Sequence, residues 1–208
     1  MILITQLYKT HSVRLKEIEK SLKKNVENPY IKEIILLNET PIELEKELDK
    51  SKIKQVIVKQ RLSYKIAFEY AKHNITNNEI VILANSDIWF DNTLNLIKNY
   101  DLNKQIISLS RYDLKDNDNY ELFSTHNSQD CWIFKNPICL QYDHNFQLGK
   151  GGCDNRIAWI INQSKKNGIK YEIINPAKSI KSYHEHKSNI RNWVGGEIKG
   201  PYHFIKIT

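Results

Sequence analysis

The sequence has few cysteines, and their spacing argues against two kinds of small scaffold. Cys131, Cys139 and Cys153 are the only three, and no two of them form a Cys-x-x-Cys pair. An odd number without this spacing argues against a disulfide framework and against a structural zinc site. Free thiols persist in a reducing compartment, so we predict a cytoplasmic location.

Long apolar runs, internal repeats and linkers are also absent from the sequence. No run approaches the roughly 20 apolar residues of a membrane-spanning helix, so we predict no transmembrane segment. The first ten residues, MILITQLYKT, lack a basic n-region and a cleavage site, and we interpret them as a strand rather than a signal peptide. A chain of 208 residues without a linker is predicted to form one domain.

Positive charge is in excess but is not concentrated in one stretch. The formal net charge is +7, and the lysines alternate with glutamates along predicted helix faces. Interspersed charge is typical of a solvated surface, so we predict no nucleic-acid partner. Phosphates on a small ligand, or an anionic membrane surface, would explain the excess equally well.

Strands and helices alternate through the first half of the chain. We expect strands at residues 2–8, 33–37, 53–58 and 80–84, and helices at 12–24, 40–49 and 64–73. This alternation predicts parallel strands joined by right-handed crossovers, hence an α/β fold with a mostly parallel sheet. The second half is less regular. It is expected to contain helices at 93–100 and up to 166, strands at 105–109, 130–134 and 169–174, and a mobile polar loop at 111–121.

Residues 79–94 predict a central strand that ends at a ligand-binding site. A buried strand, 80–84, ends in Asn85, Ser86 and Asp87. Ligands of open α/β sheets bind beyond the carboxyl ends of the strands, and a carboxylate there suits a divalent cation that carries phosphates. The alternative is that these three residues simply form a turn.

Polar residues follow three further strands, and the topology would gather them into the same crevice. Arg61 has a planar fork that suits a base edge or a diphosphate, and Asn38 and Glu39 suit a base or a ribose. Each cluster taken alone resembles a turn or a helix cap. The predicted ligand-binding set is Thr5, Gln6, Tyr8, Asn38, Glu39, Arg61, Tyr64, Asn85, Ser86 and Asp87.

Two acids and two histidines in the second half are candidates for chemistry. Asp154 follows a glycine-rich loop at a helix start, where it is either a cap (a role Asn155 would fill equally well) or a general base. Asp130 enters an apolar strand and needs a partner if it is buried, or it orients a sugar hydroxyl. His184 and His186 stand two residues apart, so an extended chain turns both toward one ligand. Together with Asp87 they predict a metal site.

The motifs and their order along the chain resemble those of GT-A-fold glycosyltransferases, most closely the small family-2-like enzymes that use nucleotide sugars. Asn85-Ser86-Asp87 matches the Asp-x-Asp element, Asp154 matches the acid that opens a helix, and His184 or His186 matches the late histidine. The resemblance covers about residues 1–190. Asn85 departs from the pattern because an acid is usual there, so a metal would rest on Asp87 and one histidine.

The resemblance implies a hexosyltransferase-type enzyme that inverts the anomeric carbon with the help of Mn²⁺ or Mg²⁺. The donor would be a nucleotide-diphosphate sugar, and the acceptor a glycan or a lipid-linked or protein-linked sugar. Asp154 would be the base, with Asp130 as the next candidate. Residues 1–100 would bind the nucleotide sugar, residues 101–190 would form the acceptor and catalytic half, and residues 191–208 would be a docking tail.

Two other functions fit parts of the sequence. A nucleotidyltransferase or another sugar-nucleotide-processing enzyme would share the sheet and the metal carboxylate. These enzymes usually carry a glycine-rich loop after the first strand, whereas residues 5–11 contain no glycine. A carbohydrate- or nucleotide-binding module without catalysis is the second alternative, suggested by Asn85. A product assay distinguishes such a module from a working transferase.

Overall fold

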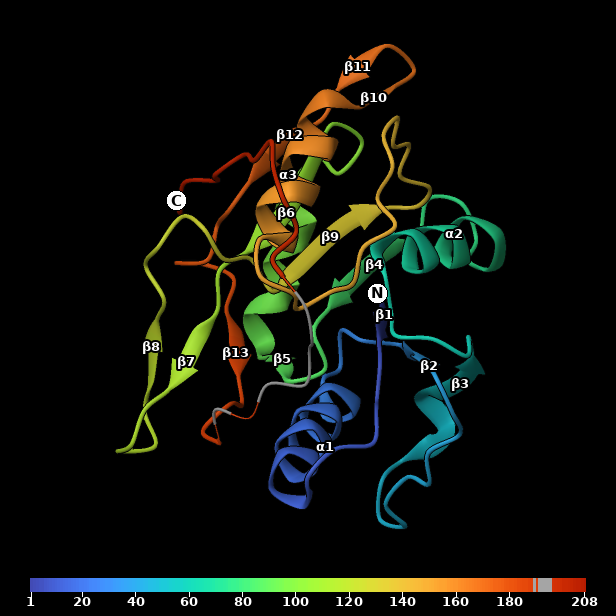
Figure 1. Cartoon of the computed structure of the whole chain (residues 1–208), viewed down its shortest axis with the longest axis vertical. Helices are drawn as coiled ribbons and strands as arrows, with labels where there is room; N and C mark the ends of the chain where they lie inside the picture. Colours follow the sequence, from blue (N-terminus) through green and yellow to red (C-terminus); the bar gives the residue numbers. More distant parts are fainter. Residues whose placement is uncertain (189, 191–195) are drawn as a thin grey trace.

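A seven-stranded mixed sheet forms the centre of the computed structural model, which describes residues 1–188, 190 and 196–208 (Figure 1). One strand, β9, is antiparallel to both of its neighbours, and all other adjacent strands are parallel. The predicted α/β fold with a mostly parallel sheet is therefore confirmed. The strand order is β12 (Glu172–Ile174), β6 (Gln105–Leu109), β9 (Cys131–Lys135), β4 (Ile80–Ala84), β1 (Ile2–Thr5), β2 (Glu33–Asn38) and β3 (Ile53–Ile57).

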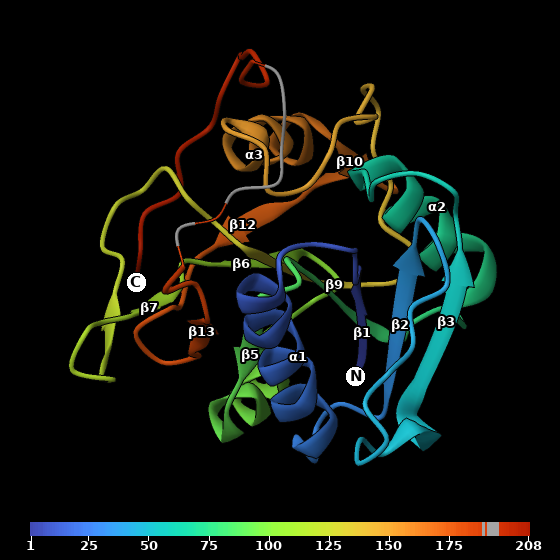
Figure 2. The same cartoon turned by 60° about the horizontal axis from the view of Figure 1, so that its bottom comes forward.

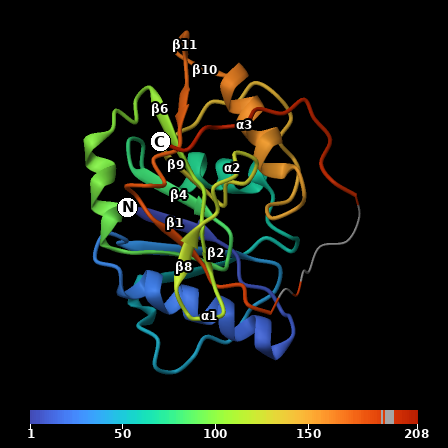
Figure 3. The same cartoon turned by 90° about the vertical axis from the view of Figure 1, so that its left-hand side faces the viewer.

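Helices cover both faces of this sheet. Helix α1 (Ser12–Glu27) lies on one face, and α2 (Tyr64–Asn74) and α3 (Cys153–Gln163) lie on the other (Figures 2 and 3). Successive strand residues point to opposite faces, so Ile2 and Ile4 join the core under α2 and α3, while Leu3 joins the core under α1. Burial on both sides explains why β1, β2 and β4 are almost continuous apolar runs.

A second sheet of four short strands pairs residues 182–184, near the end of the chain, with residues 88–90, which closely follow β4. Its order is β5 (Ile88–Phe90), β13 (Ser182–His184), β7 (Tyr112–Leu114) and β8 (Tyr120–Leu122). The polar residues 111–121 were expected to form a mobile loop, but they form most of the β7–β8 hairpin. Aromatic packing holds this hairpin against β13. The ring of Tyr183 stacks on that of Trp89, with 4.1 Å between the ring centres, and forms a T-shaped contact with Tyr120, with 4.9 Å between the ring centres.

Three expected helices differ from the structure. Residues 40–49 are not helical, because the Gln55 side chain binds both the N–H and the C=O of Ile42. The segment ends in a short 3-10 helix, η1 (Lys50–Lys52), and the helix expected at 93–100 is also a 3-10 helix, η2 (Asn92–Asn99). Helix α3 ends before the expected residue 166, and a small hairpin follows, β10 (Lys165–Lys166) and β11 (Ile169–Lys170), with its turn at Asn167 and Gly168.

The expected docking tail, residues 191–208, lies partly outside the described residues, and Trp193 falls in that part. In the described part, Ile205 is buried, whereas Tyr202 and Phe204 are 38% and 56% exposed. The Thr208 N–H donates to the Asn175 carbonyl at 2.8 Å. Among the described helices, none has the length and the apolar composition needed to cross a membrane.

Candidate functional site

A cavity of about 340 Å³ opens at the carboxyl ends of β1 and β4. Its walls come from the loops after β1, β3 and β4, from the glycine-rich residues 149–152 and from the segment after β13. Several sequence-predicted residues from distant parts of the chain meet there. They are Gln6, Tyr8, Arg61, Asn85, Ser86, Asp87, Asp130, Asp154, His184 and His186.

The other four predicted residues do not line the cavity. Thr5 is buried, and Glu39 is exposed. Asn38 is buried and joins two loops, since its Oδ1 accepts from the Leu7 N–H at 2.8 Å and its Nδ2 donates to Gln55 at 3.0 Å. Tyr64 lies behind the wall of the cavity, with its hydroxyl 3.3 Å from Asp154 Oδ1.

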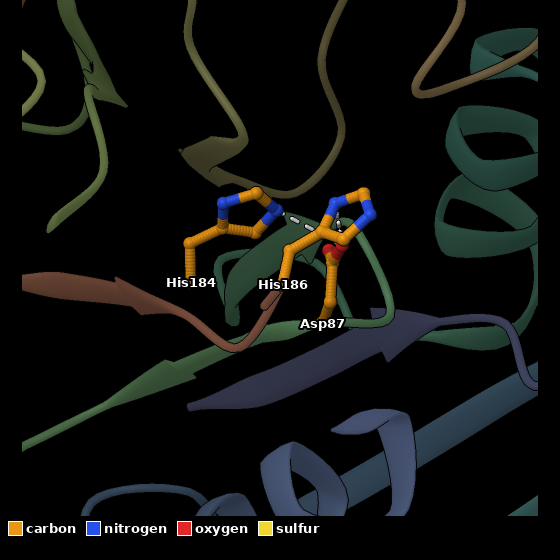
Figure 4. Close-up of side chains that lie close together, drawn as sticks. All are labelled: Asp87, His184 and His186. Atoms are coloured by element: carbon orange, nitrogen blue, oxygen red, sulfur yellow. Dashed lines mark hydrogen bonds and ion pairs between the residues drawn. The ribbon is translucent and has the colours of Figure 1, made fainter. Parts of the chain in front are cut away.

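Three basic side chains surround Asp87. Its Oδ2 accepts from Arg14, lies 3.0 Å from His184 Nε2 and lies 3.8 Å from His186 Nδ1 (Figure 4). Burial on its own would raise the pKa of Asp87, but the charges of His184 and Arg14 hold that pKa well below its usual range. Asp87 is therefore an ionised carboxylate at neutral pH.

The two histidines reach Asp87 from one extended segment and differ in charge. His184 also contacts Asp113, with 2.8 Å between His184 Nδ1 and Asp113 Oδ1. Burial would lower the pKa of His184, but the two carboxylates raise it to about 9. Burial and the charge of Arg14 lower the pKa of His186, so this ring is neutral at pH 7. The buried His186 Nε2 has no hydrogen-bond partner among the described residues.

Asp87, His184 and His186 offer one ligand atom each, and these atoms lie within 4.8 Å of one another. A carboxylate with two imidazoles suits divalent first-row cations such as Mn²⁺, which would replace the proton on His184 Nε2. Arg14 contacts the same Asp87 oxygen, so its fixed charge would repel a cation. The donors therefore fit a divalent cation best when an anionic ligand, such as a diphosphate, offsets this charge.

Arg14 was not foreseen from the sequence. It comes from α1, is 4% exposed, and also donates to Glu17 at 2.9 Å and to the Glu185 carbonyl at 3.1 Å. The sequence does indicate that Arg14 is buried, because it stands four residues before Ile18 and eight before Leu22, on the apolar stripe of the helix. A buried arginine at an apolar position requires an anionic partner.

Both carboxylate oxygens of Asp130 accept hydrogen bonds from neighbouring side chains. Its Oδ1 accepts from Asn85 Nδ2 at 2.8 Å, and its Oδ2 accepts from Arg111 Nη1 at 2.7 Å. Asn85, which stands where the resembled family has an acid, therefore binds Asp130 and not Asp87. Arg111 is a second arginine that was not foreseen, because the polar segment around it was interpreted as a mobile loop.

Asp154 stands at the start of α3 but does not cap it. The N-cap is Gly152, at φ 77°, where a Cβ atom would lie 2.5 Å from the Ile198 carbonyl oxygen. Only glycine fits this position, and it leaves the Asp154 carboxylate free to face Tyr64 and Cys153. Burial and the nearby charge of Asp130 raise the pKa of Asp154 to about 7. A carboxylate with this pKa can accept a proton near neutral pH.

No family model matches the sequence, and no curated protein matches it either. The crystal structure of HddC from Yersinia pseudotuberculosis is similar, with a TM-score of 0.50 and 11% identity over 88% of this chain and 92% of HddC. At this identity the likeness concerns the fold alone, a GT-A-like α/β fold.

Two further similar structures have lower scores. S. aureus TarS residues 1–349, in complex with UDP-GlcNAc, has a TM-score of 0.41 and 12% identity over 61% of this chain and 38% of that one. The 4-diphosphocytidyl-2C-methyl-D-erythritol synthase from Anaerococcus prevotii has a TM-score of 0.39 and 14% identity over 64% of this chain and 69% of that one.

Proposed function

We propose that this protein is a glycosyltransferase of the hexosyltransferase type, which moves a sugar from a nucleotide-diphosphate sugar to an acceptor hydroxyl. One observation carries the proposal. The same cavity contains an Asp-His-His group suited to a divalent cation and, separately, a carboxylate whose pKa is raised to about 7. A cation held by the Asp-His-His group would stabilise a diphosphate leaving group. The carboxylate with the raised pKa could accept the proton of an attacking hydroxyl group.

The donor would occupy the side of the cavity formed by Asp87, Ser86 and Arg61. Asp87, His184 and His186 would hold Mn²⁺ or Mg²⁺, which when bound neutralises the charge that develops on the diphosphate. Arg61 and Lys150 also line the cavity and add positive charge near the phosphates. Tyr8 lies below Arg61, with 5.7 Å between the Arg61 Cζ and the ring centre, and offers an aromatic face to a base.

Asp154 would act as the general base on the acceptor side. The acceptor oxygen attacks the anomeric carbon, the bond from this carbon to the diphosphate oxygen breaks, and the hydroxyl proton passes to Asp154. Attack from the face opposite the leaving group inverts the anomeric configuration. Asp130 is a weaker candidate for the base, because both of its oxygens are already bound by Asn85 and Arg111.

The loop after β1 favours this function over a nucleotidyltransferase. Phosphate loops use free backbone N–H groups, often supplied by glycines. Here the Leu7 N–H is bound to Asn38 Oδ1, and the Gln6 side chain binds the Leu37 carbonyl at 2.8 Å and the Leu62 N–H at 3.0 Å. This loop is therefore tied to β2 and to residue 62.

The organisation and location of the protein are part of the same proposal. We propose that residues 1–208 act as one domain, with a donor half at 1–100, an acceptor half at 101–190 and a docking tail at 191–208. The three cysteines are free thiols, which fits a cytoplasmic enzyme. The acceptor would be a glycan or a lipid-linked or protein-linked sugar.

A transfer assay tests the function. The purified protein is incubated with Mn²⁺, a panel of nucleotide sugars and mono- or disaccharide acceptors, and the released nucleoside diphosphate is measured. We expect release with one donor class, and a loss of about 10²–10⁴-fold in Asp154→Asn. Asp116→Asn is the control, because Asp116 is exposed in the turn of the β7–β8 hairpin. Normal turnover by Asp154→Asn would refute the assignment of the base.

A further inference from the structure

Arg111 links three side chains at the edge of the cavity. It lies between β6 and β7, and its side chain is 17% exposed. Its Nε donates to Asp113 Oδ1 at 2.7 Å, and its Nη1 donates to Asp130 Oδ2 and to Ser128 Oγ, each at 2.7 Å. Because the guanidinium is planar and rigid, it fixes the separation of the two carboxylates.

Asp113 connects this arginine to a candidate metal ligand. The same Oδ1 that accepts from Arg111 lies 2.8 Å from His184 Nδ1. The backbone register places Asp113 directly opposite His184 in the parallel β7–β13 pair, so the sheet itself aligns the two side chains. The other ring nitrogen, His184 Nε2, is left facing Asp87.

This arrangement matches the surroundings of histidines that bind metals. Such a histidine usually donates its second ring N–H to a carboxylate, which fixes the tautomer and makes the ligating nitrogen more basic. If Asp113 served only the packing of the hairpin, its carboxylate would not need to contact His184 Nδ1. Asp113 and Arg111 thus form a continuous chain from His184 to Asp130, which lies beside Asp154.

We propose that Asp113 and Arg111 are positioning residues. Asp113 orients His184 toward the cation, and Arg111 ties Asp113 to Asp130, so that the donor and acceptor sides of the cavity keep a fixed separation. This inference rests on the proposed function. Both residues act through His184 and Asp130 and take no proton themselves.

The test is the affinity of the protein for Mn²⁺, measured from the free-Mn²⁺ signal in electron paramagnetic resonance, with Mn²⁺ alone and with UDP or GDP added. Loss of such an outer carboxylate typically weakens metal binding by about 10–100-fold, and we expect this for Asp113→Ala. Asp113→Asn keeps an acceptor oxygen and should weaken binding less. Arg111→Lys keeps the charge but loses the fork, and it should also weaken binding. The control is Asp116→Asn, at an exposed residue in the turn of the same hairpin.

The ¹⁵N chemical shifts of the His184 ring provide a second readout. Asp113 should hold the proton on Nδ1 in the metal-bound protein, and this preference should be lost in Asp113→Ala. If Asp113→Ala does not fold, the decision falls to Asp113→Asn.

Wild-type Mn²⁺ affinity in the folded Asp113 variants would overturn the inference, and so would a wild-type protein that binds no Mn²⁺. In either case the transfer assay with Asp154→Asn still decides the proposed function separately.

Discussion

The rate of sugar transfer should depend on pH through Asp154. Burial and the charge of Asp130 raise the pKa of this carboxyl to about 7, whereas an ordinary aspartate has a pKa of 3.8. The base works only when it is ionised. About a tenth of it is ionised at pH 6 and about nine tenths at pH 8, so kcat/KM should rise about tenfold between these values.

The charge of Asp130 gives this prediction a second, independent test. Four side chains act on Asp154: the Asp130 charge raises its pKa, and Cys153, Arg111 and Tyr64 lower it. Asp130→Asn removes the negative charge but keeps an oxygen that Arg111 can bind. The pKa of Asp154 should therefore fall, and the acid limb of the profile should move to lower pH.

The assay is kcat/KM for donor turnover from pH 5.5 to 8.5, measured with Mg²⁺ and at low donor concentration, so that the profile reports the free enzyme. Asp116→Asn should reproduce the wild-type profile. A flat profile between pH 6 and 8, or a limb that moves upward in Asp130→Asn, would refute the assignment of Asp154 as the titrating base.

Two further predictions concern Gly152 and Arg14. Gly152→Ala should lower the free energy of unfolding, measured with denaturant, by more than Gly168→Ala does. Both positions have a positive φ, which costs about 1 kcal/mol for alanine. At Gly152 a Cβ atom would also lie 2.5 Å from the Ile198 carbonyl oxygen, whereas at Gly168 it would meet nothing within 4 Å. Equal losses would contradict the close approach. Arg14→Met should tighten the binding of Mn²⁺ in the absence of nucleotide, measured by calorimetry, because it removes the fixed charge from Asp87. Unchanged or weaker binding would show that Arg14 does not compete with the cation.

Much of the fold was predictable because it depends on local pattern. Strand β4 is a short apolar run followed by polar residues, and burial on both faces requires such a run. Ser63 caps α2 as expected, with its Oγ accepting from the Ile66 N–H. The convergence of Gln6, Arg61 and Asp87 was predictable from topology, since the carboxyl ends of parallel strands share one edge of a sheet.

The parts of the fold that the sequence did not predict depend on contacts between distant segments. Residues 40–49 carry a helical pattern, but the Gln55 side chain binds the backbone of Ile42 in a non-helical form. The strands of the second sheet are only three residues long, too short for a recognisable alternation. Because this sheet was missed, so were the roles of Arg111 and Asp113, which acquire their partners only when β7 pairs with β13.

Thermal unfolding shows whether this cavity binds a nucleotide diphosphate together with a divalent cation. The melting temperature is measured with UDP, GDP, CDP and ADP, each with and without Mn²⁺. A ligand at about 100 times its Kd adds roughly 2.7 kcal/mol, which for a chain of this length is a rise of about 5–11 °C. We predict a rise that needs both one nucleotide diphosphate and Mn²⁺ and that disappears in Asp87→Ala. If none of the four nucleotides raises the melting temperature, the cavity is not a site for a nucleotide diphosphate.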